Sequence, residues 1–464
     1  MSRTSWLSFI VVCVASAAGP VHGADARAVR ANAPADGAFG IAGDFTPGDG
    51  AAGAAAAPPA EPDGELGMRR ALSLALARSP ELASFGWRLR AAEAREVQAG
   101  LLPNPELGVR TEDIGVSGQT RGIDQAEMTV ELGQLIELGG KRAARLEVAE
   151  RGRDLASWDY EIERIELASR VAQAFVGVLV AQEQVALVDE SVRLANEVVA
   201  AVALRVRAGG TSTVEQTRAE VALATVRVEL DESRRALDVA RRELAATWGS
   251  TSPRFARAVG RLELVDDVPS LPELEARIDA SPSVARWTSE LLERRALLDL
   301  ERSRAVPDVT ASGGYRRLFD PDENTFVVGF SVPLPVLNRN QGAIAEAEHR
   351  AEQARADQEA TRVRVTAALD GAYQAVVTAR SQVATLEREV LPGAREVFDT
   401  LNAGYREGRF SYLEVLDAQR TLIAARAQRV RALGDYQRAV VTLERLLGEP
   451  VASGAASVGG RSER

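Results

Sequence analysis

Few residues of this chain carry the side chains that catalysis or tight metal binding requires. The sequence of 464 residues contains one cysteine, Cys13, and two histidines, His22 and His349. It therefore has no cluster of histidines and cysteines with metal-ligand spacing. The hydroxyls in the segment TSTVEQ, residues 211–216, have no histidine beside them to activate a nucleophile. We expect that the protein is not an enzyme, holds no resident metal and needs no cofactor.

The segment LGGKR, residues 138–142, looks at first like part of a phosphate-binding loop. Such a loop needs the pattern G-x-x-x-x-G-K followed by serine or threonine. Here the first glycine is misplaced, and Arg142 stands where the hydroxyl residue must be. The net charge of −10 also argues against a nucleic-acid partner.

Carboxylates are the remaining groups that can do chemistry. Glu414 and Asp417 are three residues apart, a spacing that places both on one face of a helix. Glu215 lies in a similar setting earlier in the chain. A solvated helix face is the simpler interpretation, and the residues alone favour it. The alternative is an acidic site that attracts cations.

The chain that positions these residues repeats itself. The pair Ser79-Pro80 recurs as Ser281-Pro282, a shift of 281 − 79 = 202 residues. Later the shift is 408 − 209 = 199, and it relates Gly209 to Gly408, Glu215 to Glu414, and Gly249 to Gly448. Turn and cap residues that recur in the same order predict a tandem duplication in which each copy is one structural unit.

Composition predicts the boundaries around the two copies. Residues 1–23 contain a basic residue, a short apolar run and small residues, which is typical of a cleaved signal peptide. A lipid anchor on Cys13 is the disfavoured alternative, because Val12 precedes it instead of a small residue. Residues 24–65, rich in Ala, Gly and Pro, are expected to be a disordered leader, and 449–464 a disordered tail. The copies then occupy 66–262 and 263–448.

Each copy is predicted to contain an opening helix, two alternating strands of about 9–11 residues and a helical hairpin. The apolar strand faces comprise Ala126, Met128, Val130 and Leu132 in the first copy, and Phe326, Val328, Phe330 and Val332 in the second. One interpretation is a small soluble sheet with one face on a core. The other is a transmembrane barrel with these faces toward lipid, which requires an oligomer because four strands cannot close a barrel.

The helices that follow are long. Residues 141–207 contain no proline, and a helix of that length spans about 100 Å. Apolar residues in its last part alternate steps of three and four, the pattern of a coiled-coil seam: Val185, Val188, Val192, Ala195, Val199, Val202 and Val206. The segments RAGGTST and REGRFSY are expected to form the tight turns of the two hairpins, and Pro392-Gly393 a kink.

Several segments resemble the TolC-type outer membrane efflux proteins, and within them the heavy-metal cation branch of the CzcC and CusC type. They are NPELGVRTEDIG, QLIELGGKRAARLEVAE, VPLPVLNRNQGAIAEAE and GYREGRFSYLEVLDAQ. With the duplication, the resemblance covers roughly residues 68–448. It implies a mixed α and transmembrane β fold: a homotrimer with four strands from each protomer, closing a twelve-stranded barrel in the outer membrane of a Gram-negative bacterium. A helical tunnel continues that barrel through the periplasm.

The resemblance also implies a function and partners. The protein would be the passive exit duct of a tripartite efflux system, in contact with outer membrane lipid and working with a periplasmic adaptor and an inner-membrane RND pump. Its substrates would be divalent heavy-metal cations such as cobalt, zinc and cadmium. The alternatives are a duct for drugs or other small molecules, a periplasmic coiled-coil adaptor, and a hydrolase. An adaptor needs a lipoyl-like domain and lacks four alternating strands, and the residue inventory argues against a hydrolase.

Roles for individual residues follow from the same resemblance. The periplasmic gate would contain Glu414, Asp417 and Glu215. The adaptor-contacting tips would contain Arg207, Gly209, Gly210, Arg406, Gly408 and Arg409. The turn from barrel to tunnel would contain Gly139, Gly140, Lys141, Pro333 and Pro335. By the same resemblance, the best-known drug ducts carry an arginine where Phe410 stands here, with Arg409 next to it, and the sequence leaves open which interaction closes the gate.

Overall fold

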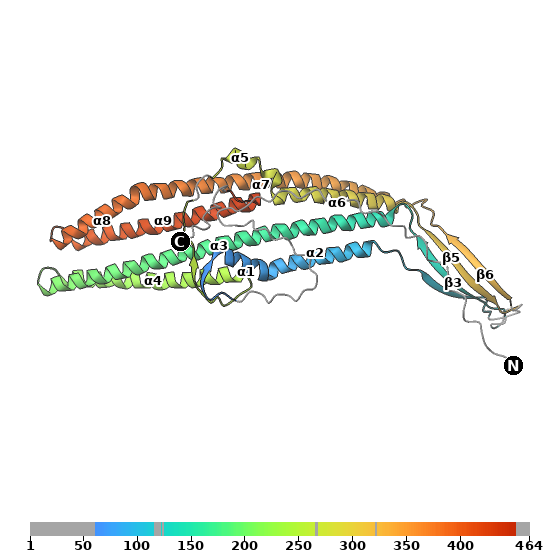
Figure 1. Ribbon diagram of the computed structural model, residues 1–464, viewed down its shortest axis with the longest axis horizontal. Helices are drawn as coiled ribbons and strands as arrows, with labels where there is room; N and C mark the ends of the chain where they lie inside the picture. Colours follow the sequence, from blue (N-terminus) through green and yellow to red (C-terminus); the bar gives the residue numbers. More distant parts are fainter. Residues whose placement is uncertain (1–60, 116–121, 123–124, 265–267, 321–322, 452–464) are drawn as a thin grey trace, which may run out of the picture. The chain divides into compact units, whose positions relative to one another are not determined.

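The computed structural model describes residues 61–115, 122, 125–264, 268–320 and 323–451. The predicted signal peptide with Cys13, most of the leader and the end of the tail lie outside the described residues. In the described part, each half of the chain contributes helices and two strands of one four-stranded sheet (Figure 1).

The four-stranded sheet is antiparallel and mixes both copies. Its strands are β2 (Glu106–Glu112), β3 (Glu127–Ile136), β5 (Val309–Leu318) and β6 (Glu323–Ser331), in the order β2-β3-β5-β6. β3 pairs with β5, which joins the two copies at the middle of the sheet. β2 has 7 residues, fewer than the 9–11 expected, whereas β6 has 9 and β3 and β5 have 10 each.

The predicted alternation along these strands is confirmed. The apolar face is open: Phe326 is 87% exposed and Val328 is 75% exposed. Its other large exposed residues are Leu107, Val109, Met128, Leu132, Tyr315 and Phe330. Ala126 differs, because it lies just before β3 and is only 1% exposed. The opposite face carries charged and small polar side chains, among them Glu127, Thr129 and Arg316.

The helices of the first copy are α1 (Met68–Arg78), α2 (Pro80–Ala99), α3 (Lys141–Arg207) and α4 (Thr213–Ala246). α3 is one continuous helix of 67 residues, as its lack of proline predicts. It packs against α2, α4, α6 and α9, and all seven residues of the predicted seam are buried or half-buried. α3 is also the one described helix long and apolar enough to cross a membrane by length and composition alone, and 44% of that stretch is buried within the protein.

The second copy has the same plan with an interruption. Its helices are α5 (Leu271–Glu275), η2 (Ile278–Ala280), α6 (Pro282–Arg304), α7 (Gln341–Thr385), η3 (Leu386–Val390), α8 (Leu391–Arg406) and α9 (Tyr412–Leu447). η3 is a π-helical turn that ends just before Pro392. Proline lacks an N–H and clashes with the carbonyl four residues earlier, so a π turn at this place accommodates it. The interruption therefore lies where the Pro-Gly pair predicted a kink.

The two copies make equivalent glycine–proline contacts between the end of their last helix and the start of α2 or α6. Gly249 and Gly448 have φ of +75° and +73°. A Cβ on Gly249 would lie 3.1 Å from Pro80 Cγ, and one on Gly448 would lie 2.5 Å from Pro282 Cγ. In each copy the glycine that follows the last helix packs against the proline at the start of α2 or α6, as expected for a duplicated unit.

Two chain segments are ordered where disorder was expected. β1 (Gly64–Gly67) pairs in parallel with β4 (Phe255–Val259), an unpredicted sheet that begins inside the expected leader. Glu61 accepts hydrogen bonds from Trp248 Nε1 at 3.3 Å and Ser250 Oγ at 3.1 Å. At the other end Val451 is 1% exposed, inside the expected tail. Apolar burial of Leu66 and Val451 explains why order extends past both boundaries.

Candidate functional site

The predicted site residues gather at the two ends of α3. Its first residue, Lys141, follows β3 and the glycines of the barrel-to-tunnel turn. Its last, Arg207, precedes the tip of the first hairpin. A helix of 67 residues separates these places by about 100 Å, so they are two sites. We refer to them as the junction and the tip.

At the junction, two successive glycines reverse the chain between strand and helix. Gly139 and Gly140 have φ of +70° and +75°, a region that non-glycine residues avoid. Gly139 is also confined, because a Cβ there would lie 2.7 Å from Val306 Cβ and 3.0 Å from the carbonyl oxygen of Ser303. Gly140 has open space around it. The turn therefore needs Gly139 for both its backbone and its lack of a side chain.

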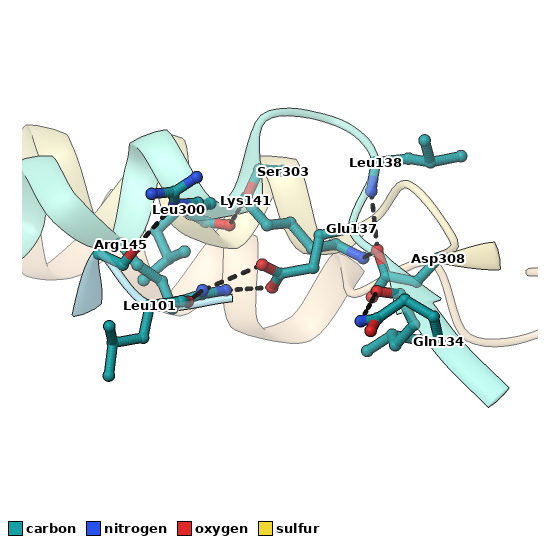
Figure 2. A network of polar contacts seen from close by, with 12 residues as sticks. Leu101, Gln134, Glu137, Leu138, Lys141, Arg145, Leu300, Ser303 and Asp308 are labelled. Atoms are coloured by element: carbon teal, nitrogen blue, oxygen red, sulfur yellow. Dashed lines mark hydrogen bonds and ion pairs between the residues drawn. The ribbon is translucent and has the colours of Figure 1, made fainter. Parts of the chain in front are cut away.

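Asp308, just before β5, fixes the turn to the second copy. Its Oδ1 accepts from Lys141 Nζ at 2.7 Å and from the Leu138 N–H at 3.0 Å (Figure 2). Burial alone would raise the pKa of this carboxyl. The hydrogen bonds and positive charge of Lys141, with the Leu138 N–H, outweigh it and hold the pKa below its usual value. Asp308 is a partner that sequence reasoning missed, since it lies 167 residues from Lys141.

Arginines next to the turn hold the preceding segments in place. Arg145 donates to both carboxylate oxygens of Glu137, with Nη2 to Oε2 at 3.0 Å (Figure 2). Arg142 Nε donates to the carbonyl oxygen of Gly100 at 2.7 Å, at the end of α2. The junction therefore ties together β3, α2, α3 and the start of β5.

In the second copy the residue just before the tunnel helix α7 is Asn340, its N-cap. Its φ is +59°, matching Gly140 in the first copy. Its side-chain amide donates to the carbonyl oxygen and to the carboxylate of Glu301, both at 2.8 Å. Pro333 and Pro335 lie in the irregular segment between β6 and α7, as expected. Their role in turning the chain stays a prediction. Asn340, whose positive φ asparagine tolerates, is a turn residue that sequence reasoning missed.

At the tip, both hairpins turn through the same glycine motif. Gly209 and Gly408 have φ of +72° and +80°. After α3, the N–H of Gly209 donates to Val206 O at 3.0 Å, and that of Gly210 to Arg205 O at 2.9 Å. After α8, Gly408 and Arg409 donate in the same pattern at 3.0 and 2.8 Å. These pairs of bonds define Schellman motifs, which terminate helices at a left-handed residue.

The tip arginines have different surroundings. Arg207 Nε donates to the carbonyl oxygen of Ala203, one turn earlier in α3, at 3.3 Å. Arg409 forms an ion pair with Glu407. Arg406 is exposed, and its contact with the adaptor stays a prediction.

An aromatic cluster holds the two hairpins together just behind the turns. Tyr405 and Tyr412 are buried with ring centroids 6.3 Å apart, and Val202 of α3 packs with them. The Arg205 guanidinium lies 4.7 Å from the centre of the Tyr405 ring. Phe410 lies against Gly404, where a Cβ would meet the ring. Sequence reasoning missed this aromatic cluster. Its contact with Gly404 makes Phe410 a packing residue.

One of the three predicted gate carboxylates, Glu414, takes part in a helix cap. Ser411 and Glu414 form a capping box at the start of α9, with Ser411 N to Glu414 Oε2 at 2.7 Å and Glu414 N to Ser411 Oγ at 3.4 Å. The hydrogen bonds from the Ser411 backbone and hydroxyl lower the pKa of Glu414. Glu215 accepts from the hydroxyl of Thr211. Asp417 is exposed one turn after Glu414, so both carboxylates lie on the face that the spacing predicted.

No group of three or more histidine, cysteine, aspartate or glutamate side chains in the described part of the chain has a geometry that would hold a metal ion. The site residues are backbone-shaping glycines, ion pairs and surface carboxylates. Such an arrangement can position helices and attract cations.

Comparison with known proteins identifies the fold. The family described as "Outer membrane efflux protein" matches residues 71–250 and again residues 275–449. The chain belongs to this family. Members are outer membrane channels of Gram-negative bacteria, and this protein is such an efflux channel with the mixed strand-and-helix fold of the TolC type. The adaptor alternative is therefore wrong.

Individual relatives place the chain within the family. The cobalt-zinc-cadmium resistance protein CzcC of Cupriavidus metallidurans is 38% identical over 390 residues, covering 84% of this chain and 92% of CzcC. The nickel and cobalt resistance protein CnrC of the same organism is 30% identical, covering 66% of this chain and 73% of CnrC. A crystal structure of CusC has a TM-score of 0.69 at 19% identity, covering 82% of this chain and 92% of that one. The branch resemblance is confirmed by these relatives. Channels of the family are trimeric and work with an adaptor and an RND pump.

Proposed function

We propose that this protein is the outer membrane exit duct for divalent heavy-metal cations, formed by three copies of the chain. The observation that carries the proposal is the 38% identity to CzcC, a cobalt-zinc-cadmium resistance protein, over 84% of this chain and 92% of CzcC. The duct is passive, and the energy and the choice of metal come from an inner-membrane RND pump joined to it by a periplasmic adaptor.

The open edges of the sheet support a trimer. β2 and β6 are the outer strands of the four-stranded sheet, and each has one edge without a partner strand within the described chain. Each unpaired backbone N–H or C=O group in lipid costs on the order of several kcal/mol. A sheet within a membrane must therefore close into a barrel. Four strands are too few, and three copies supply twelve.

The charge on the polar face supports a cation as substrate. This face carries five carboxylates and two arginines, a net charge of 2 − 5 = −3 for each protomer. The residues are Glu106, Glu112, Glu127, Glu131, Glu323, Arg110 and Arg316. Arg316 pairs with Glu127 at 2.8 Å, and Arg110 with Glu131 at 3.6 Å. If this face lines the lumen, the remaining negative charge raises the local concentration of cations.

The tip is proposed as both gate and docking site. Glu414 and Asp417 would face the threefold axis, where three copies of each carboxylate attract cations, with Glu215 beside them. The turns that contain Gly209, Gly210 and Gly408 would form the surface that the adaptor binds. The exposed arginines Arg207, Arg406 and Arg409 lie within two residues of Gly209 or Gly408 in the sequence and would contribute to that surface.

Deletion of the gene from its host tests the proposed function. Loss should sensitise cells to cobalt, zinc or cadmium and raise their cell-associated metal, and the intact gene should restore both. The matched control is the same gene carrying Val328→Arg on the apolar face, which should not restore resistance. Sensitivity to drugs with unchanged metal tolerance would instead support a drug duct, and no change in either would contradict the proposal.

A further inference from the structure

Two apolar segments beside the sheet are exposed in the single chain. The entry segment, residues 101–105 (LLPNP), leads from α2 into β2, and the exit segment, residues 332–337 (VPLPVL), leads from β6 toward α7. Leu102 of the entry segment is 65% exposed. Leu334 and Leu337 of the exit segment are 80% and 88% exposed. Neighbouring aliphatic side chains that are this exposed indicate a surface that another molecule covers.

The strand order brings these segments to the same level of the molecule. All neighbouring strands in the order β2-β3-β5-β6 are antiparallel, so β2 and β6 run in opposite directions. The entry segment precedes the start of β2, and the exit segment follows the end of β6. Both therefore lie at the helical end of the sheet, one beside each open edge.

Closing the barrel places the two segments against each other across a protomer boundary. When β6 of one copy pairs with β2 of the next, they pair antiparallel, as every other pair in the sheet does. The exit segment of the first copy then runs next to the entry segment of the second. Each segment spans five or six residues, so a modest shift in strand register still leaves them in contact.

The composition of the segments fits an interface between copies better than contact with lipid. Leu101 and Leu102 are consecutive, yet they are 53% and 65% exposed, so apolar surface is not confined to one side. Val336 and Leu337 behave in the same way at 68% and 88%. Lipid covers only the outward side of a barrel, whereas a neighbouring chain covers an edge from both sides.

The prolines of both segments support the same arrangement. Pro103 and Pro105 in one segment, and Pro333 and Pro335 in the other, have no backbone N–H. They stop the strand ladder at the end of the barrel and leave few donors without partners when the segments are buried. Apolar contact between side chains then replaces the ladder.

We propose that the exit segment of one protomer packs on the entry segment of the next and forms an apolar seal at the level where barrel meets tunnel. The seal rests on the proposed trimer. Three identical contacts of this kind surround the duct, just beyond the point where strand hydrogen bonds end. They exclude water from the gaps between protomers and keep cations inside the duct as they pass from tunnel to barrel.

Cysteine crosslinking in isolated outer membranes tests the seal. Cys13 is the only cysteine in the sequence, so the background is low. The variant Leu102→Cys with Leu334→Cys should give reducible dimers and trimers on oxidation. Leu101→Cys with Val336→Cys, joined by a flexible bis-maleimide, covers a shift in register. The control pair, Leu102→Cys with Val221→Cys on the exposed side of α4, should stay monomeric.

Two further measurements separate the possible failures. The mass of the detergent-purified protein reports the trimer independently of the seal, and a monomeric mass would refute the proposed assembly itself. A trimeric mass with no crosslink from either pair would overturn the seal alone. A nitroxide on Leu334→Cys should be shielded from oxygen relative to one on Val328→Cys. Equal accessibility would assign the exit segment to lipid and overturn the proposal.

Discussion

The two glycines of the junction offer a matched test of how strand and tunnel helix are joined. Gly139→Ala and Gly140→Ala place the same methyl group on neighbouring residues with nearly the same φ, +70° and +75°. Only at residue 139 does the new Cβ meet other atoms. The two variants therefore share the backbone cost and differ in the steric cost.

The magnitudes follow from the contacts. A left-handed conformation costs a residue other than glycine about 1–2 kcal/mol, and both variants bear this cost. At Gly139 the Cβ would lie 2.7 Å from Val306 Cβ and 2.9 Å from its Cγ2. Carbon atoms normally approach to about 3.5–4.0 Å, and overpacking of this kind costs about 1–3 kcal/mol. We expect Gly139→Ala to be about 2 kcal/mol less stable than Gly140→Ala.

Thermal denaturation of the purified oligomer, followed by circular dichroism, ranks the variants. Gly140→Asn should melt near the unmodified protein, because Asn340 takes the equivalent place in the second copy. Gly140→Ala should melt lower and Gly139→Ala lowest. Val306→Gly removes both valine atoms that the new Cβ would meet and leaves the contact with the Ser303 carbonyl oxygen, so it should recover part of the loss in Gly139→Ala. Equal melting of the two alanine variants, or no recovery, would refute the steric account of the junction.

Three other changes test separate parts of the molecule. Val328→Arg should prevent assembly, because an arginine on a lipid-facing strand costs about 2–4 kcal/mol at mid-membrane. Val327→Arg, on the opposite face of β6, should assemble. The trimer yield in outer membranes compares the two variants, and equal yields would contradict the assigned faces. Burial raises the pKa of Glu444 to about 7, against a minor lowering by the Val451 N–H, so the folded state binds a proton that the unfolded state releases. The free energy of unfolding should then fall by about 3 kcal/mol per protomer as pH rises from about 4.5 to about 7. Glu444→Gln should reduce the dependence of the melting temperature on pH. An unchanged dependence would disprove the raised pKa of Glu444. Gly408→Val, at φ +80°, should leave the barrel intact but weaken capture of the adaptor in a pull-down, and normal capture would count against the tip as the docking site.

Residues with strong local signals were predictable from the sequence. The strand faces followed from alternation in β3, β5 and β6, and the seam of α3 from its steps of three and four. Gly209 and Gly408 follow a long helical pattern, where a left-handed C-terminal residue is common, and both have positive φ. Each of these signals lies within a few residues of the feature that it predicts.

Contacts between distant segments were not predictable in the same way. β1 has only 4 residues, too few for a period, and its partner β4 lies about 190 residues later. Lys141 and Asp308 are joined only when the two copies pack, as are Tyr405 and Val202 at the tip. The capping box of Ser411 and Glu414 differs, because its S-x-x-E pattern is visible in the sequence and was overlooked.

The ion selectivity of single channels tests the central claim most directly. Purified protein reconstituted into a planar bilayer should form discrete channels without ATP or a pump. Under a gradient of potassium chloride, the reversal potential should show preference for cations, and Glu414→Gln with Asp417→Asn should reduce that preference while leaving the trimer intact. A reversal potential that indicates anion preference, or full selectivity in the neutralised variant, would contradict a cation duct gated by these carboxylates.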